Sequence, residues 1–114
     1  MTLRYDLRIN QGETFQLSIP VFDSEGDPMP VSGMIARAQV RAYANAPAVL
    51  HNWSLTDDNI ALVDNNVILK VPAAVSAAWT WRTGRWDVEL VDGAGAVTRL
   101  AEGFVIVHPE VSRS

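Results

Sequence analysis

Two histidines are the residues of this chain best suited to acid–base or metal chemistry, and neither has the neighbours that such chemistry needs. His51 and His108 lie far apart in the sequence, each beside apolar residues in a strand-like context. A zinc site or a catalytic pair would need further His, Cys, Asp or Glu ligands, and no HExxH or HxH spacing occurs. The chain has no cysteine, and none of its serines stands in a GxSxG motif. The sequence therefore predicts no catalytic residue, no metal ligand and no enzyme activity.

Alternating carboxylates at Asp23, Glu25 and Asp27 resemble the start of a calcium-binding loop. Such a loop needs glycine at its sixth position and a bidentate glutamate at its twelfth, where this chain has Pro28 and Met34. The pattern favours a solvated, turn-forming acidic loop instead. No GxGxxG motif precedes a helix, so no cofactor is expected.

Four tryptophans are the remaining candidates for function. Tryptophan anchors protein interfaces and stacks on sugar rings, and it also fills cores. Trp79 and Trp86 stand in contexts that favour the core, whereas Trp53 and Trp81 lie near connections. We therefore take Trp53 and Trp81 as the candidate partner-binding residues.

Strands must position these side chains, because most of the chain alternates between apolar and polar residues. The expected strands are 4–9, 13–22, 34–43, 49–53, 60–63 and 67–71, followed by a three-stranded meander over 86–91, 97–101 and 104–107. Within the meander, residues 97–101 are ambiguous, and Gly103 is a candidate bulge. Pro20 lacks an amide hydrogen, which places its backbone nitrogen at a sheet edge or at a bulge.

Residues 73–79, AAVSAAW, have high helix propensity, and Val75 and Trp79 stand at the i, i+4 spacing of one helical face. One or two helical turns are expected there, bridging one end of a sandwich. The predicted fold is all-β: a single immunoglobulin-like antiparallel β-sandwich over residues 1–114, with one short helix near residues 73–79.

Arginines and carboxylates alternate with apolar residues on two of the expected strands. Arg37 and Arg41 project from the polar face of 34–43, and Asp87 and Glu89 project from that of 86–91. If the two strands are neighbours, we expect these residues to form cross-strand ion pairs.

The net charge of −4 and the isoelectric point near 4.9 argue against nucleic-acid binding. The sequence contains no run of about 20 apolar residues, so no membrane-spanning segment is expected. The N-terminal residues show no signal peptide. We therefore expect an intracellular product.

The order of several short motifs resembles the LtfC-like β-sandwich domains of tailed-bacteriophage virion proteins. The matching motifs are NQGETF at 10–15, GDPMPVSG at 26–33 with ARAQVR at 36–41, GRWDVEL at 84–90, RLAEG at 99–103 and HPEVSR at 108–113. The order of these motifs is also similar to their order in the amino-terminal domains of phage baseplate upper proteins.

The resemblance implies a noncatalytic virion structural protein of the tail, baseplate, neck or head. Such a protein would be made in the host cytoplasm, localise to the virion, bind other virion proteins and form a homo-oligomer in the particle. The alternative is a carbohydrate-binding sandwich that attaches to the host surface through Trp53 or Trp81. This alternative requires at least one of the two rings to be exposed.

Overall fold

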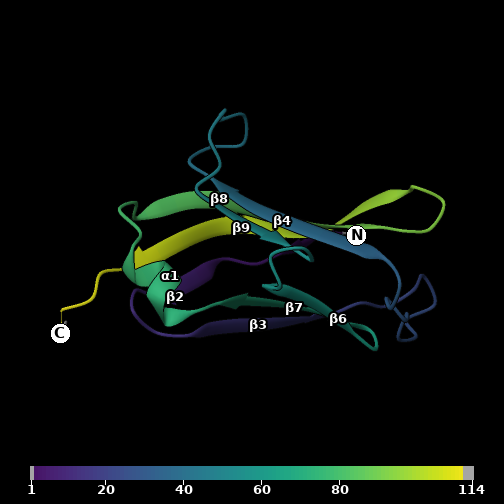
Figure 1. Ribbon diagram of the computed structural model, residues 1–114. Coiled ribbons are helices and arrows are strands. Elements are labelled where there is room, and N and C mark those ends of the chain that lie inside the picture. The colour runs from purple at the N-terminus through teal and green to yellow at the C-terminus, as the bar shows by residue number, and fades with distance from the viewer. Residues whose placement is uncertain (1, 112–114) are drawn as a thin grey trace.

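The computed structural model describes residues 2–111, which form nine strands and one short helix (Figure 1). The strands are β1 (Leu3–Arg4), β2 (Leu7–Asn10), β3 (Phe15–Pro20), β4 (Ile35–Arg41), β5 (His51–Ser54), β6 (Ile60–Val63), β7 (Asn66–Val71), β8 (Thr83–Val91) and β9 (Val97–His108), and the helix is α1 (Ala73–Ala77).

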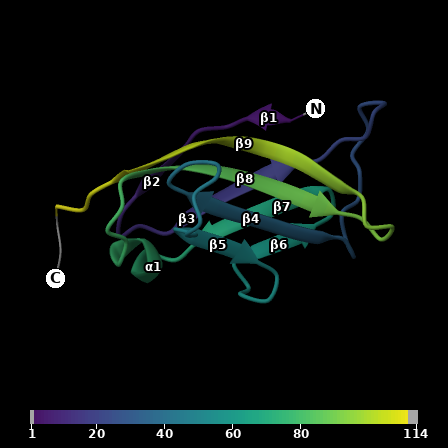
Figure 2. The same ribbon diagram turned by 90° about the horizontal axis from the view of Figure 1, so that it is seen from above.

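The strands form two sheets that pack as the two layers of a sandwich (Figures 1 and 2). The large sheet has the order β1-β9-β8-β4-β5, with β2 also paired to β9, and the small sheet has the order β3-β7-β6. Neighbouring strands are antiparallel except for β1 and β2, which run parallel to β9. The predicted all-β antiparallel sandwich is confirmed, and β3 lies at a sheet edge, the first of the two positions expected for Pro20.

Alternation along the strands builds the core between the sheets. In β4 every second residue is buried, and β8 follows the same pattern. The completely buried valines are Val31, Val40, Val67, Val71, Val88 and Val105. Burying a valine or leucine side chain contributes roughly 1.5–3 kcal/mol, so the residues that this two-residue period buries supply the attraction between the layers.

The first predicted strand, 4–9, is wrong in one respect, because the structure breaks it into β1 and β2 at Tyr5 and Asp6. There the side chain of Asp6 replaces a backbone partner, since its Oδ1 accepts a hydrogen bond from the amide of Phe104 at 2.9 Å. The carbonyl of Tyr5 accepts a bond from Trp86 Nε1 at 2.7 Å. A Cβ at Gly103 would collide with that carbonyl, so Gly103 is required for the close approach rather than for a bulge.

The terminal meander is also corrected, because residues 97–108 form one long strand and not two. The bulge lies where Val88 pairs with Ala101 but Glu89 pairs with Arg99, which leaves Leu100 as the extra residue. An extra residue reverses the facing of those that follow, which explains the ambiguous alternation of 97–101.

Helix α1 connects the small sheet to the large sheet at one end, as predicted, but it ends at Ala77. Its buried residue is Ser76, while Val75 is exposed, so the expected pairing of Val75 with Trp79 on one helical face is wrong. Gln11 fixes the segment from the β2–β3 turn by donating from Nε2 to the carbonyl of Trp79 at 2.9 Å. No helix in residues 2–111 is long and apolar enough to cross a membrane.

Candidate protein-binding face

Charged side chains gather on the solvent-facing side of the large sheet, which we call the outer face. Every second residue of β4, β8 and β9 points outward, and the strand register aligns these residues in rows. Along the face the rows are Ile35, Val91 and Val97; Arg37, Glu89 and Arg99; Gln39, Asp87 and Glu102; and Arg41, Arg85 and Phe104.

The outer face is cationic although the chain is acidic. Its strands present six arginines and three carboxylates: Arg4, Arg8, Arg37, Arg41, Arg85 and Arg99 against Asp87, Glu89 and Glu102. The whole chain has nine lysines and arginines and thirteen aspartates and glutamates. Most cations therefore lie on one surface, and most carboxylates lie elsewhere.

The predicted cross-strand ion pairs are half correct. Strands β4 and β8 are neighbours, and Arg37 Nε lies 2.9 Å from Glu89 Oε1. Arg41 instead donates to neutral acceptors, the carbonyl of Ala46 at 2.6 Å and Oε1 of Gln39 at 3.0 Å. Its charge therefore has no carboxylate partner within residues 2–111.

Arg99, rather than Arg41, forms the second set of ion pairs with the carboxylates of the face. Its guanidinium lies 2.9 Å from Glu102 Oε1 and 3.6 Å from Asp87 Oδ2. Burial raises the pKa of Asp87 above its ordinary value of 3.8, Glu89 raises it further, and Arg99 opposes both effects. The carboxylates at the centre of the face are thus held by one arginine.

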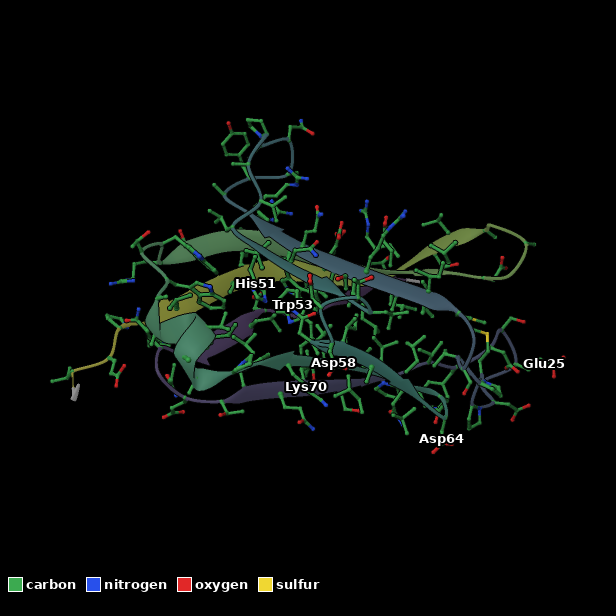
Figure 3. The ribbon with its side chains drawn as sticks, in the orientation of Figure 1. Glu25, His51, Trp53, Asp58, Asp64 and Lys70 are labelled. Carbon is green, nitrogen blue, oxygen red and sulfur yellow. The ribbon has the colours of Figure 1, made fainter. Side chains whose placement is uncertain are left out.

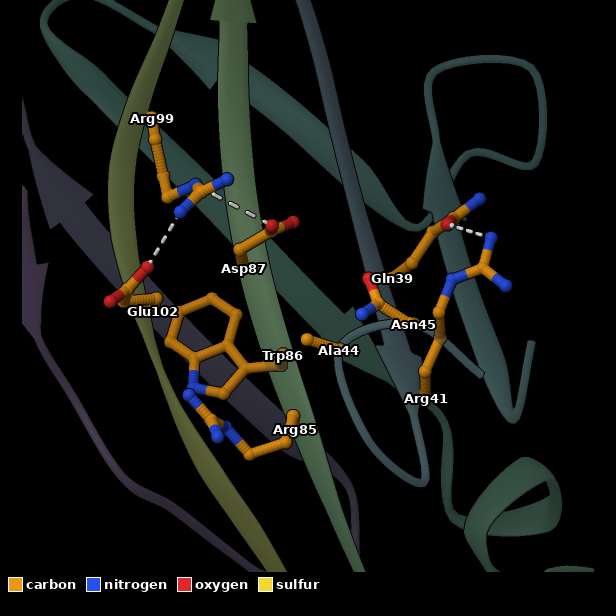
Figure 4. A pocket seen from close by; sticks show the side chains of 9 residues that line it. All are labelled: Gln39, Arg41, Ala44, Asn45, Arg85, Trp86, Asp87, Arg99 and Glu102. Atoms are coloured by element: carbon orange, nitrogen blue, oxygen red, sulfur yellow. Dashed lines mark hydrogen bonds and ion pairs between the residues drawn. The ribbon is translucent and has the colours of Figure 1, made fainter. Parts of the chain in front are cut away.

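A hollow of about 410 Å³ lies at this part of the outer face (Figure 4). Its charged lining consists of Arg41, Arg85, Arg99, Asp87 and Glu102. Ala44 and Asn45 of the β4–β5 connection form one wall, and Figure 1 shows this connection rising above the sheet. The outer face is therefore concave, with a protruding loop beside the concavity.

Exposed apolar side chains flank the charged rows. Ile35 is 55% exposed and Val97 is 51% exposed at one end of the face. Phe104 is 45% exposed, and the guanidinium carbons of Arg85 and Arg4 lie 4.8 Å and 4.9 Å from the centre of its ring. Of these two arginines, Arg4 also pairs with Asp6, its Nε lying 3.3 Å from Asp6 Oδ1, whereas the stacking of Arg85 on the ring needs no carboxylate.

Trp53, one of the two candidate partner-binding residues, is a core residue. Its exposed fraction is 0%, and its Nε1 donates to the carbonyl of Lys70 at 3.0 Å. This bond joins β5 of the large sheet to β7 of the small sheet. Trp53 therefore connects the layers and offers no surface to a partner (Figure 3).

Trp81 is half-buried, and its ring lies 4.7 Å from that of Trp79, centre to centre. His51 packs edge-on against Trp53 and Trp79 in the same aromatic cluster. Within residues 2–111 Trp81 Nε1 and His51 Nε2 are buried and unpaired. Trp53 is covered and cannot be the open ring that the carbohydrate-binding alternative requires, which leaves only the half-buried Trp81. A protein-binding role for Trp81 stays a prediction.

The acidic loop after β3 has the turn-forming role that was predicted for it. Asp23 Oδ1 accepts hydrogen bonds from the amides of Glu25 and Asp27 at 2.9 Å and 3.0 Å. Within residues 2–111 no group of three His, Cys, Asp or Glu side chains is placed to hold a metal ion.

The sequence reasoning missed Arg85, Arg99 and Phe104 as members of the outer face. Arg85 shares its alternation with Asp87 and Glu89, so its outward direction could be inferred. Arg99 and Phe104 lie on opposite sides of the bulge at Leu100. Because the bulge changes the register between them, simple alternation could not place them on one face.

No family model and no curated protein matches the chain. Solved structures with the same fold include one from a study of multimeric cell-adhesive interactions of VGSC beta subunits, at 12% identity and a TM-score of 0.53, covering 92% of each chain. Another is a parallel homodimer of the extracellular domain of the voltage-gated sodium channel beta4 subunit, at 10% identity and a TM-score of 0.51, covering 97% of this chain and 96% of that chain.

These matches support the immunoglobulin-like sandwich and contradict the virion structural role that was expected from the phage resemblance. The two structures named above come from studies of cell adhesion by voltage-gated sodium channel beta subunits, and neither is a phage protein. The resemblance to LtfC-like domains stays a prediction from sequence, and the function drawn from it is withdrawn.

Proposed function

We propose that this chain is a noncatalytic protein-recognition module that associates with copies of itself through the outer face of the large sheet. The observation that carries the proposal is the concentration of six arginines on this one face of an acidic chain. A cationic face and an anionic remainder attract each other between molecules.

The residue types on the face are those that protein interfaces use. Arginine and aromatic residues are enriched among the side chains that dominate binding energy. Phe104, stacked between Arg4 and Arg85, combines both types. The homodimer and the adhesive contacts described for the two similar structures support the same class of function.

The three carboxylates on the face favour a protein over a nucleic acid as the partner. Asp87, Glu89 and Glu102 lie among the arginines. These carboxylates would repel the phosphates of a nucleic acid backbone that crossed the face. A protein surface can place single carboxylates opposite the unpaired arginines only.

The test compares Arg85→Glu with Lys70→Glu in sedimentation equilibrium at low and at physiological salt. Each change reverses one positive charge, at the half-exposed Arg85 or at the exposed Lys70. Lys70 is the control because it lies on the small sheet, away from the outer face. We expect the parent chain to self-associate, Arg85→Glu to weaken association by about tenfold or more, and Lys70→Glu to leave it unweakened. A parent chain that is monomeric throughout, or equal effects of the two variants, would contradict the proposal.

A further inference from the structure

One end of the sandwich carries five carboxylates and neither lysine nor arginine. This acidic end consists of three connections, residues 21–34, 63–66 and 91–97, and its carboxylates are Asp23, Glu25, Asp27, Asp64 and Asp92. The amide of Val31 donates to the carbonyl of Asp64 at 2.9 Å, which joins the first two connections. Figure 3 shows Glu25 and Asp64 at this end, and the β8–β9 turn extends there in Figure 1.

The hollow on the outer face has the opposite net charge, because three arginines and two carboxylates line it. Arg99 holds both carboxylates of the lining, Asp87 and Glu102. The remaining two cations, Arg41 and Arg85, contact a backbone carbonyl, an amide oxygen and an aromatic ring. Within residues 2–111 neither lies within ion-pair distance of a carboxylate. Two positive charges are therefore available to an incoming carboxylate.

We propose that the hollow binds the acidic end of a second copy of this chain, so that copies associate head to tail. This inference rests on the proposed function and adds the occupant of the face. Two outer faces packed against each other would bring together surfaces on which arginines outnumber carboxylates, and like charges oppose that arrangement. The head-to-tail contact pairs a cationic hollow with an end that has no cation to repel it.

A head-to-tail contact has a consequence that a symmetric dimer lacks. Each copy in a pair still has one free hollow and one free acidic end, so association continues into open chains unless a ring closes. The acidic loop protrudes beyond the strands, and the hollow is concave beside the raised β4–β5 connection (Figures 1 and 4). A protruding end and a concave receiver fit this mode of contact.

The experiment mixes two variants, each damaged on one side of the contact. The hollow variant is Arg85→Glu, with Arg85→Gln as a milder second form. The end variant is Glu25→Lys with Asp27→Lys, which spares Asp23 and Asp92 because their carboxylates hold turns. Circular dichroism and urea unfolding establish that each variant is folded before association is measured.

We expect each variant alone to associate about tenfold or more weakly than the parent chain. The end variant keeps an intact hollow and the hollow variant keeps an intact acidic end, so an equimolar mixture should form one-to-one pairs and stop there. Light scattering would show pairs in the mixture and longer assemblies in the parent chain.

Three results would overturn the inference, and one of them would also overturn the proposed function. If the end variant assembles as the parent chain does while Arg85→Glu does not, the outer face binds something other than the acidic end, and only this inference fails. If Arg85→Glu also assembles normally, the proposed function fails with it. A mixture that stays monomeric excludes the head-to-tail contact.

Discussion

The two faces of the large sheet come from the same strands and carry opposite kinds of side chain. The inner face of β4 presents Ala36, Ala38 and Val40, all buried, and its outer face presents Arg37 and Arg41. The side chains of the inner face stabilise the sandwich, and those of the outer face are available to bind a partner. Changes to the inner face should therefore lower the free energy of unfolding, whereas changes to the outer face should act on association.

The largest loss of stability should come from Trp53→Ala, because this change removes a completely buried ring on the inner face. We expect the free energy of unfolding to fall by about 3–5 kcal/mol. Trp53→Phe keeps most of the packing and loses the bond to the Lys70 carbonyl, so it should cost about 1–3 kcal/mol. Urea unfolding measures both. A loss below about 1 kcal/mol for Trp53→Ala would mean that the ring does not join the sheets.

Gly103→Ala should have the next largest effect, because the new Cβ would collide with the carbonyl of Tyr5. We expect a loss of about 1–3 kcal/mol, as for an overpacked core site. The tryptophan fluorescence should also change, since the same carbonyl accepts the bond from Trp86. The matched control is Gly93→Ala, where nothing lies within 4 Å of the added atom, so its stability should be unchanged or slightly higher.

His51 makes the stability of the inner face dependent on pH. Burial lowers the pKa of His51 below its ordinary value of 6.5, and Asp57 opposes this effect more weakly. The folded state therefore disfavours the protonated ring, so stability is greatest above pH 6.5 and falls as the pH drops from there towards the lower pKa of the folded state. Unfolding curves over this range measure the loss.

His51→Phe should abolish the pH-dependent component that His51 contributes, whereas His108→Gln on the exposed end of β9 should retain it. If the parent chain and His51→Phe lose stability in parallel, the aromatic cluster is not the pH-sensitive element.

The smallest effect on the free energy of unfolding is expected from changes to the outer face. The pair of Arg37 and Glu89 is partly exposed, so a double-mutant cycle with Arg37→Ala and Glu89→Ala should give a coupling of about 0.2–1 kcal/mol in favour of the folded state. The coupling should shrink at high salt. A coupling of several kcal/mol would erase the distinction between a stabilising inner face and a recognition outer face.

Local patterns were sufficient to predict most elements. Alternation identified β4 and β8 and the two strands β6 and β7, between which Asp64 adopts a left-handed conformation. It also placed Arg37 and Glu89 on the polar faces of their strands, so that an ion pair was expected if the two strands were neighbours, as they are. These features depend on residues within one strand or one turn, where the period of two applies without knowledge of the fold.

Features that depend on distant contacts escaped prediction. Trp53 is buried because the small sheet supplies the Lys70 carbonyl, and no pattern around Trp53 announces that partner. The break between β1 and β2 requires the Asp6 carboxylate to meet the Phe104 amide, almost the full length of the chain away. The cationic outer face appears only when the strand order is known, since its arginines come from five strands.

The parallel pairing of β2 with β9 has a mechanical consequence. Residues 7–10 lie beside residues 105–108 and run in the same direction, so the chain enters the sandwich at one side and leaves it at the other (Figures 1 and 2). A force that pulls the two ends apart acts along these strands and shears all their hydrogen bonds at once. An antiparallel pair at the same place would open one bond at a time. This strand arrangement therefore equips the sandwich to resist tension between its termini.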